Sequence, residues 1–130
     1  MNAATAAAER LLAEKASLAE EIAAALYAEM PELLSRYGED GRRKCLEDMH
    51  YNLEHLAPSV DLADPALFAS YVRWLDGLLR ARNVATAEVV CSLRITEERI
   101  RARFRAEEHA AIVPSIRAGL DALGAPAEET

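Results

Sequence analysis

Asp48, Asn52 and His55 are the residues whose types and spacing are best suited to chemistry. They fall on one face of a helix, because a helix turns by about 100° per residue. A carboxylate, an amide and an imidazole on one face can orient a polar ligand or bind a metal weakly. Three groups from a single helix do not close a metal site, since bundle metal sites draw ligands from several helices. The alternative interpretation is a half-buried polar flank that hydrogen-bonds to neighbouring helices.

A second candidate is the aromatic set Phe68, Tyr71 and Trp74, which has helical spacing and could line an apolar ligand cavity. The alternative is ordinary core packing, since the set is surrounded by leucines. If Trp74 is core, its replacement by Ala should cost about 3–5 kcal/mol, and much less if it lines a ligand. We predict no catalytic and no metal-binding residue. The predicted ligand-binding residues are Asp48, Asn52, His55, Tyr71 and Trp74.

Cofactor chemistry has weaker candidates. His50 and His55 could ligate haem in a globin-like packing, but a proximal His needs an apolar pocket and His50 lies only at the edge of the apolar stripe. Cys45 and Cys91 have no CxxC or Cys/His spacing, so we interpret them as buried free thiols and not as zinc ligands. The chain has no Gly-rich phosphate loop and no GxSxG elbow, so we predict no enzyme.

Composition narrows the class of protein. A chain of 130 residues fits one domain, and its hydrophobic fraction of 52% is rich in Ala, which favours helices. The net charge of -7 argues against nucleic acid or an anionic membrane surface as the main partner. No run approaches the roughly 20 apolar residues of a membrane span. Charged residues at Glu9, Arg10 and Glu14 interrupt the apolar run that a signal peptide would need near the N-terminus. We therefore expect a cytoplasmic protein.

The first half of the chain is predicted to be helical throughout. Residues 5–30 are expected to form one long helix or two helices joined near Ala16–Ser17. We prefer the break, because Ser17 and Glu20 have the spacing of a capping box. A short helix over Pro31–Tyr37 is closed by Gly38. The next helix begins near Glu39 and ends at Pro58, followed by a loop. Its predicted buried stripe is Cys45, Leu46, Met49, Leu53 and Leu56.

The second half is also helical. Asp64 caps a helix that begins at Pro65 and ends near Asn83, and its dense apolar stripe makes it the predicted central core helix. Two more helices are expected. One covers 86–104 and either bends or begins a new cap near Ile95–Thr96, and the other covers 107–123 and is kinked at Pro114. We predict a single all-α domain over 1–124, globin-like or a bundle of about six to seven helices, and a disordered tail over 125–130.

The run RYGEDGRRKC, continued by an Asp three residues on and by a DP-x-LF-x-x-YV-x-W segment, resembles a bacterial helical sensor domain. It is similar to the N-terminal half of cobalamin-binding regulatory proteins and to the domains that precede STAS domains in stressosome-type regulators. The resemblance implies a globin-like fold without haem. The matching residues are Arg36, Tyr37, Gly38, Gly41, Arg42, Cys45, Asp48, Leu53, Leu56, Asp64, Pro65, Leu67, Phe68, Tyr71, Val72, Trp74, Leu79 and Arg82.

The chain departs from that family in two ways. Asn52 stands where the family favours His, and no cobalamin-binding or STAS domain follows within the 130 residues. Any ligand-binding role of that family His therefore cannot be assigned to Asn52. What the resemblance implies is a regulatory, ligand-sensing helical domain that acts alone or in trans, as a dimer through exposed helix faces.

Three functional hypotheses follow. The first is a sensor or signal-transduction module, with no cofactor, whose pocket between the helices over 45–56 and 67–82 takes a small apolar ligand or a signalling partner protein. The second is a structural protein that dimerises through its N-terminal helix and binds nothing small. The third is a cofactor protein that carries haem, a bilin or a metal.

Overall fold

The computed structural model describes residues 2–125, and this part of the chain contains six helices and no strand, which confirms the all-α prediction. The helices are α1 (Ala3–Ala13), α2 (Lys15–Glu29), α3 (Glu32–Asp61), α4 (Pro65–Ala81), α5 (Thr86–Arg103) and α6 (Ala106–Ala122). None of the helices described is long and apolar enough to cross a membrane.

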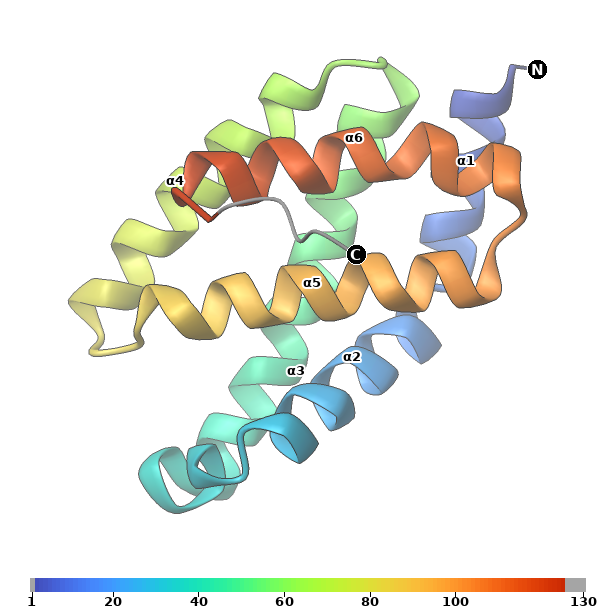
Figure 1. Ribbon diagram of the computed structural model, residues 1–130. Helices are drawn as coiled ribbons and strands as arrows, with labels where there is room; N and C mark the ends of the chain where they lie inside the picture. Colours follow the sequence, from blue (N-terminus) through green and yellow to red (C-terminus); the bar gives the residue numbers. More distant parts are fainter. Residues whose placement is uncertain (1, 126–130) are drawn as a thin grey trace.

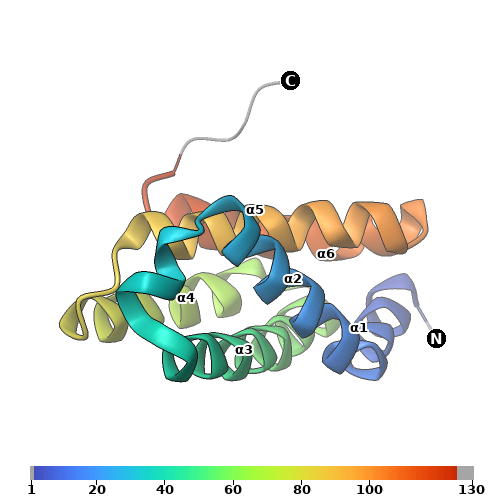
Figure 2. The ribbon, with the colours of Figure 1, turned by 90° about the horizontal axis from the view of Figure 1, so that it is seen from below.

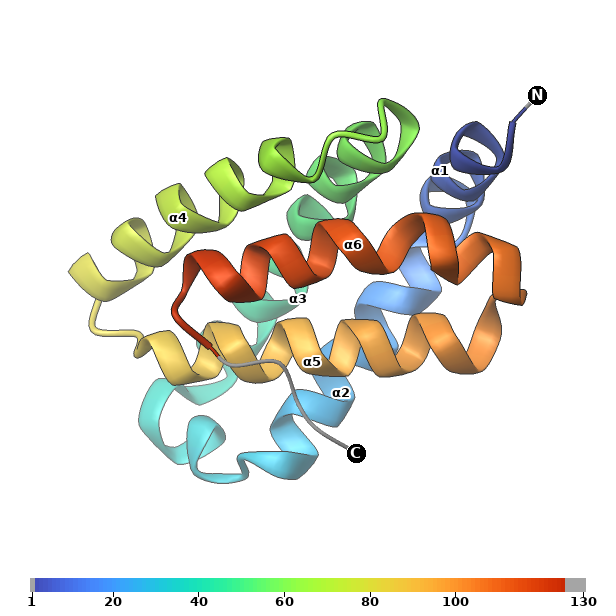
Figure 3. The same cartoon turned by 45° about the horizontal axis from the view of Figure 1, so that its top comes forward.

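The helices pack in two groups around one core. Helices α5 and α6 lie side by side, and α3 runs behind them (Figure 1). In the view turned by 90°, the α5 and α6 pair lies on one side and α3 on the other (Figure 2). Helix α4 packs closely along α6, whereas α1 and α2 both pack on α3 (Figure 3). The fully buried large side chains come from all six helices: Leu11, Leu18, Ile22, Leu33, Leu53, Leu56, Phe68, Leu93, Ile95, Ile100, Ile112 and Ile116.

The α1–α2 junction is tied to the turn between α5 and α6 by ion pairs. Arg103 reaches back to the carboxylates of Glu14 and Glu21. Arg10 bonds to Glu108 and lies over the ring of Phe104, 4.4 Å from its centroid. The predicted break in the first helix is confirmed, but it falls at Glu14 and not at a Ser17 cap.

Helix α3 contains the predicted stop at Gly38 but not the one at Pro58. Gly38 has φ 71°, a left-handed conformation that suits Gly, and it separates a short helical segment from the long one. The helix then continues through Pro58 to Asp61, so the expected loop begins three residues late. Both Pro58 and Glu54, whose carbonyl loses its helical partner, are exposed, so water can satisfy that carbonyl.

The start of α4 is as predicted, and the helix contributes to the core, but its apolar stripe is only partly buried. The Asp64 side chain accepts a hydrogen bond from the Ala66 backbone N–H, with Pro65 in the first turn. Phe68 and Val72 are buried, whereas Leu67 is 42% and Trp74 62% exposed. The buried face of α4 is narrower than its apolar stripe, because the helix packs mainly on α6.

The last two helices are more regular than expected. Helix α5 runs through Ile95 without a break. The Thr96 hydroxyl donates to the Ser92 carbonyl at 2.7 Å inside the helix and does not cap a new one. Pro114 lies inside α6, as predicted, and Gly124 has the left-handed φ of 73° that closes the helix. The predicted disordered tail, apart from Ala125, lies outside the described residues.

Candidate functional site

A large cavity of about 1260 Å³ lies between α3 and α4 and extends to the start of α5. All five predicted ligand-binding residues line it, although the structure does not test whether they bind a ligand. Its size exceeds the roughly 300–1,000 Å³ that is common for small-molecule sites. The cavity is lined by the five residues Asp48, Asn52, His55, Tyr71 and Trp74, together with further side chains that include Tyr37, Lys44, Cys45, Tyr51, Leu78, Arg82 and Glu88.

Helix α3 provides one long wall. Cys45, Asp48, Asn52 and His55 all face the cavity from this helix. Positions 45 and 55 lie on an unbroken helical segment, so they are about 15 Å apart along its axis at 1.5 Å per residue. A ligand that reaches both must be elongated, and longer than a single aromatic ring.

Asp48 is a partly buried carboxylate that forms no hydrogen bond or ion pair with another of the residues described. Burial raises its pKa above the usual range, and the positive charge of Arg82 opposes that rise. A desolvated carboxylate without a hydrogen-bond donor is energetically unfavourable. Asp48 is therefore ready to accept hydrogen bonds from N–H groups of a ligand.

Cys45 lies one helical turn before Asp48 and is a free, partly buried thiol. Burial, with a smaller contribution from the Asp48 charge, raises its pKa to about 11. Cys45 was predicted to belong to the buried stripe and not to the site. The signal was present, since positions 45, 48, 52 and 55 share a helical face.

Aromatic rings from both α3 and α4 form a second wall of the cavity. His55 stacks on Tyr71 with ring centroids 4.0 Å apart and an interplanar angle of 11°, and Trp74 follows at 6.0 Å from Tyr71. The Tyr71 hydroxyl donates to Asn52 Oδ1 at 2.7 Å, which fixes the ring between α3 and α4. We call His55, Tyr71 and Trp74 the aromatic wall.

The far end of the cavity has a second carboxylate, Glu88, which was not among the predicted site residues. Glu88, at the start of α5, is only 6% exposed and receives a hydrogen bond from Arg36 at 2.9 Å. The Tyr37 hydroxyl also donates to it at 3.1 Å. Unlike Asp48, Glu88 already accepts hydrogen bonds from Arg36 and Tyr37 within the protein. We therefore interpret it as a structural part of the cavity end and not as a group that awaits a ligand.

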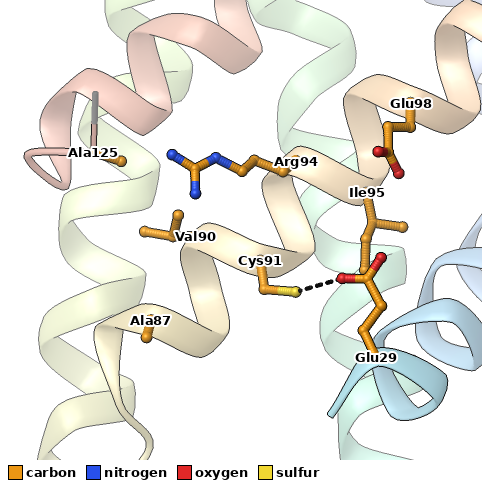
Figure 4. A pocket seen from close by; sticks show the side chains of 8 residues that line it. All are labelled: Glu29, Ala87, Val90, Cys91, Arg94, Ile95, Glu98 and Ala125. Atoms are coloured by element: carbon orange, nitrogen blue, oxygen red, sulfur yellow. Dashed lines mark hydrogen bonds between the residues drawn. The ribbon is translucent and has the colours of Figure 1, made fainter. Parts of the chain in front are cut away.

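A smaller cavity of about 560 Å³ surrounds the other thiol, Cys91 (Figure 4). The Cys91 thiol donates to Glu29 Oε2 at 3.3 Å. Arg94 and Glu98 also line this cavity, and it contains no aromatic side chain. A flat conjugated ligand therefore has a suitable surface beside Cys45 and none beside Cys91.

Haem and metal ligation gain no support from the geometry. His50 does not line the large cavity. His55 does, but it is exposed, its ring lies flat on Tyr71, and its Nδ1 is 2.9 Å from the Tyr51 carbonyl oxygen. Among residues 2–125, no three His, Cys, Asp or Glu side chains are grouped so that they could hold a metal ion.

In a comparison with known families, the model of the family described as "Phycobilisome protein" matches residues 1–123. Searches of curated proteins and of solved structures give no match. The resemblance to cobalamin-binding and STAS-type regulators is therefore wrong, and with it the sensor, signal-transduction and regulatory interpretation. Several positions behind that resemblance, such as the Asp64–Pro65 cap and buried Phe68, are ones that other helical folds also favour. The match supports the third hypothesis, a cofactor protein, in its bilin form.

Proposed function

The chain belongs to the phycobilisome protein family, whose fold is globin-like, and from this we propose that it holds one bilin in the α3–α4 cavity as a light-harvesting chromophore. A bilin is a linear tetrapyrrole, and it supplies an extended conjugated system that absorbs visible light. The observation that carries the proposal is the elongated cavity in which Cys45 and unpartnered Asp48 face inward from one helix. The protein is proposed to be non-catalytic.

Each chemical part of a bilin has a matching group in the cavity. Asp48 would accept hydrogen bonds from the pyrrole N–H groups, which provide the donors that this desolvated carboxylate lacks. Lys44 and Arg82 line the same cavity and would pair with the two propionate groups. The aromatic wall would cover the flat ring system.

Cys45 would hold the chromophore covalently. A thiol adds across the C=C bond of an ethylidene group, forming an S–C bond and passing its proton to the neighbouring carbon, so the attachment needs no oxidant or reductant. The pKa of about 11 keeps the thiol protonated at neutral pH, and attachment requires the small thiolate fraction.

Reconstitution tests this function. Purified protein is mixed with a bilin that carries an ethylidene group, and the mass of the denatured protein is measured. We expect the mass to increase by one bilin, and the bound pigment to absorb differently from the free one. Cys45→Ser should remove the covalent addition while keeping coloured, non-covalent binding, and Cys91→Ser should behave like the unmodified chain.

Two results would contradict the proposal. Attachment at Cys91 would place the chromophore in the smaller cavity. Failure to bind the ethylidene bilin and biliverdin at micromolar concentration would leave the second hypothesis, a structural protein without a ligand.

Members of this family assemble into oligomers. For this chain we propose a homodimer formed through exposed helix faces, in the cytoplasm. Sedimentation equilibrium of the bilin-loaded protein tests the dimer, and a purely monomeric mass at high concentration would contradict it. Fluorescence microscopy of a tagged chain tests the location.

A further inference from the structure

We infer that Trp74 positions the chromophore, with its exposed indole face stacking on a terminal ring of the bound tetrapyrrole. This inference rests on the proposed function and adds a residue that determines how the ligand lies. Trp74 is the only Trp in the chain and comes from the middle of α4, on the rim of the cavity.

Folding alone does not explain Trp74. Its side chain is 62% exposed, the largest aromatic surface that the described residues leave in water. It packs against Tyr71 on one side, at 6.0 Å and an interplanar angle of 38°. An indole that is held on one side and open on the other resembles a stacking platform more than a core residue.

The rest of the aromatic wall keeps this platform in place. Tyr71 is fixed by its hydrogen bond to Asn52, and burial raises its pKa, so the phenol stays a neutral donor. His55 and Tyr71 are already in contact at 4.0 Å, which leaves no room for a ring between them. A flat ligand therefore stacks at an end of the wall, and the indole offers the larger apolar face.

Stacking on Trp74 has a consequence for the excited state. A linear tetrapyrrole loses excitation when its end ring rotates about a methine bridge. Attachment at Cys45 fixes one end of the pigment, while Trp74 on the other helix restricts rotation of a second ring. Trp74 is therefore expected to affect fluorescence yield more than absorption.

The test uses biliverdin as the probe and a Cys45→Ser background, so that binding is reversible. The variants are Trp74→Ala and Trp74→Phe, and the control is Leu67→Ala, which removes another exposed apolar side chain of α4 outside the cavity. Affinity is measured by titration, and fluorescence is measured per bound pigment. Trp74 is also labelled with 2-hydroxy-5-nitrobenzyl bromide, with and without biliverdin, and quantified by mass spectrometry.

We expect Trp74→Ala to weaken binding about tenfold and to lower the fluorescence yield several-fold, Trp74→Phe to restore most of both, and Leu67→Ala to change neither. Biliverdin should protect Trp74 from labelling. If Trp74→Ala does not fold, the inference is tested by the affinity and fluorescence of Trp74→Phe and by the labelling of Trp74 with and without biliverdin.

Three outcomes would overturn the inference. One is unchanged affinity and yield in Trp74→Ala, and another is full labelling of Trp74 in the loaded protein. The third is protection of Trp74 that depends on protein concentration and not on biliverdin, which would assign the indole to a contact between copies. In all three cases biliverdin still binds, so the proposed function survives. If the protein binds no bilin at all, both the inference on Trp74 and the proposed function are contradicted.

Discussion

Alkylation of Cys45 should report its buried position through its dependence on pH. In a Cys91→Ser variant, we expect the rate of reaction with iodoacetamide to rise about tenfold per pH unit from pH 7 to pH 10. The reason is that burial raises the pKa of the Cys45 thiol from 9.0 to about 11, so no plateau appears in this range. The same chain in urea should level off near pH 9.

The magnitude follows from two opposing effects. A rise of two pKa units lowers the thiolate fraction about 100-fold at neutral pH, as each unit is a factor of ten. A thiolate of higher pKa is intrinsically more nucleophilic, with a Brønsted coefficient of about 0.4–0.5, which regains roughly sixfold to tenfold. The native protein should therefore react about 10-fold to 20-fold more slowly than the unfolded chain at pH 7, before any loss of access.

The assay follows the mass of the intact protein over time, with circular dichroism at each pH to confirm that the helices persist. Access to the thiol changes the rate by a constant factor and does not move the inflection, so the shape of the profile is the decisive result. A plateau between pH 8 and pH 9 in the folded protein would refute the reasoning. It would also place Cys45 in contact with water rather than inside the cavity wall.

Three further predictions concern stability and are measured by urea unfolding. Gly41→Ala should destabilise the protein by about 1–3 kcal/mol, because a Cβ there would lie 2.3 Å from Cβ of Tyr37. Gly77→Ala, which adds a Cβ in open space within α4, should stabilise the protein by about 0.5–1 kcal/mol, and equal effects of the two substitutions would contradict the steric argument. Ser59→Ala should cost about 1–3 kcal/mol, since the fully buried hydroxyl forms three hydrogen bonds, and a cost near zero would show that they contribute little. Burial raises the pKa of Glu108, but hydrogen bonds from the Arg105 backbone and the Arg10 side chain outweigh this effect, so the net pKa is below the usual value and the ionised group stabilises the fold above pH 5. The difference in unfolding free energy between the unmodified protein and Glu108→Gln should therefore close as the pH falls through 4, and a constant difference would refute the sign.

The helical part of the site was predictable because it depends on spacing alone. Asp48, Asn52 and His55 recur at helical intervals, and the structure places all three on the cavity side of α3. Tyr71 and Trp74 do the same on α4. Helical periodicity fixes which residues share a face, whatever the neighbouring helices do.

The composition of the far end of the cavity was not predictable in this way. Glu88 meets Arg36 and Tyr37 over about fifty positions of sequence, through the backbone turn that Gly38 permits. No local pattern links a carboxylate at the start of α5 with a kink before the long part of α3. Such pairs depend on tertiary packing, which periodicity does not describe.

The apolar stripe of α4 shows why a core and a binding surface are difficult to tell apart from sequence. The dense stripe predicted a central core helix, while Tyr71 and Trp74 within it were also predicted to line a ligand cavity. In the structure, α6 covers only the part of the stripe that includes Phe68 and Val72. The remainder, made up of Tyr71, Trp74, Leu75 and Leu78, lines the cavity together with the polar edge of α3. A stripe wider than the helix it packs against leaves apolar surface for a ligand, and the polar residues opposite set which ligand fits: Asp48 selects N–H donors, and Cys45 selects a group that a thiol can add to.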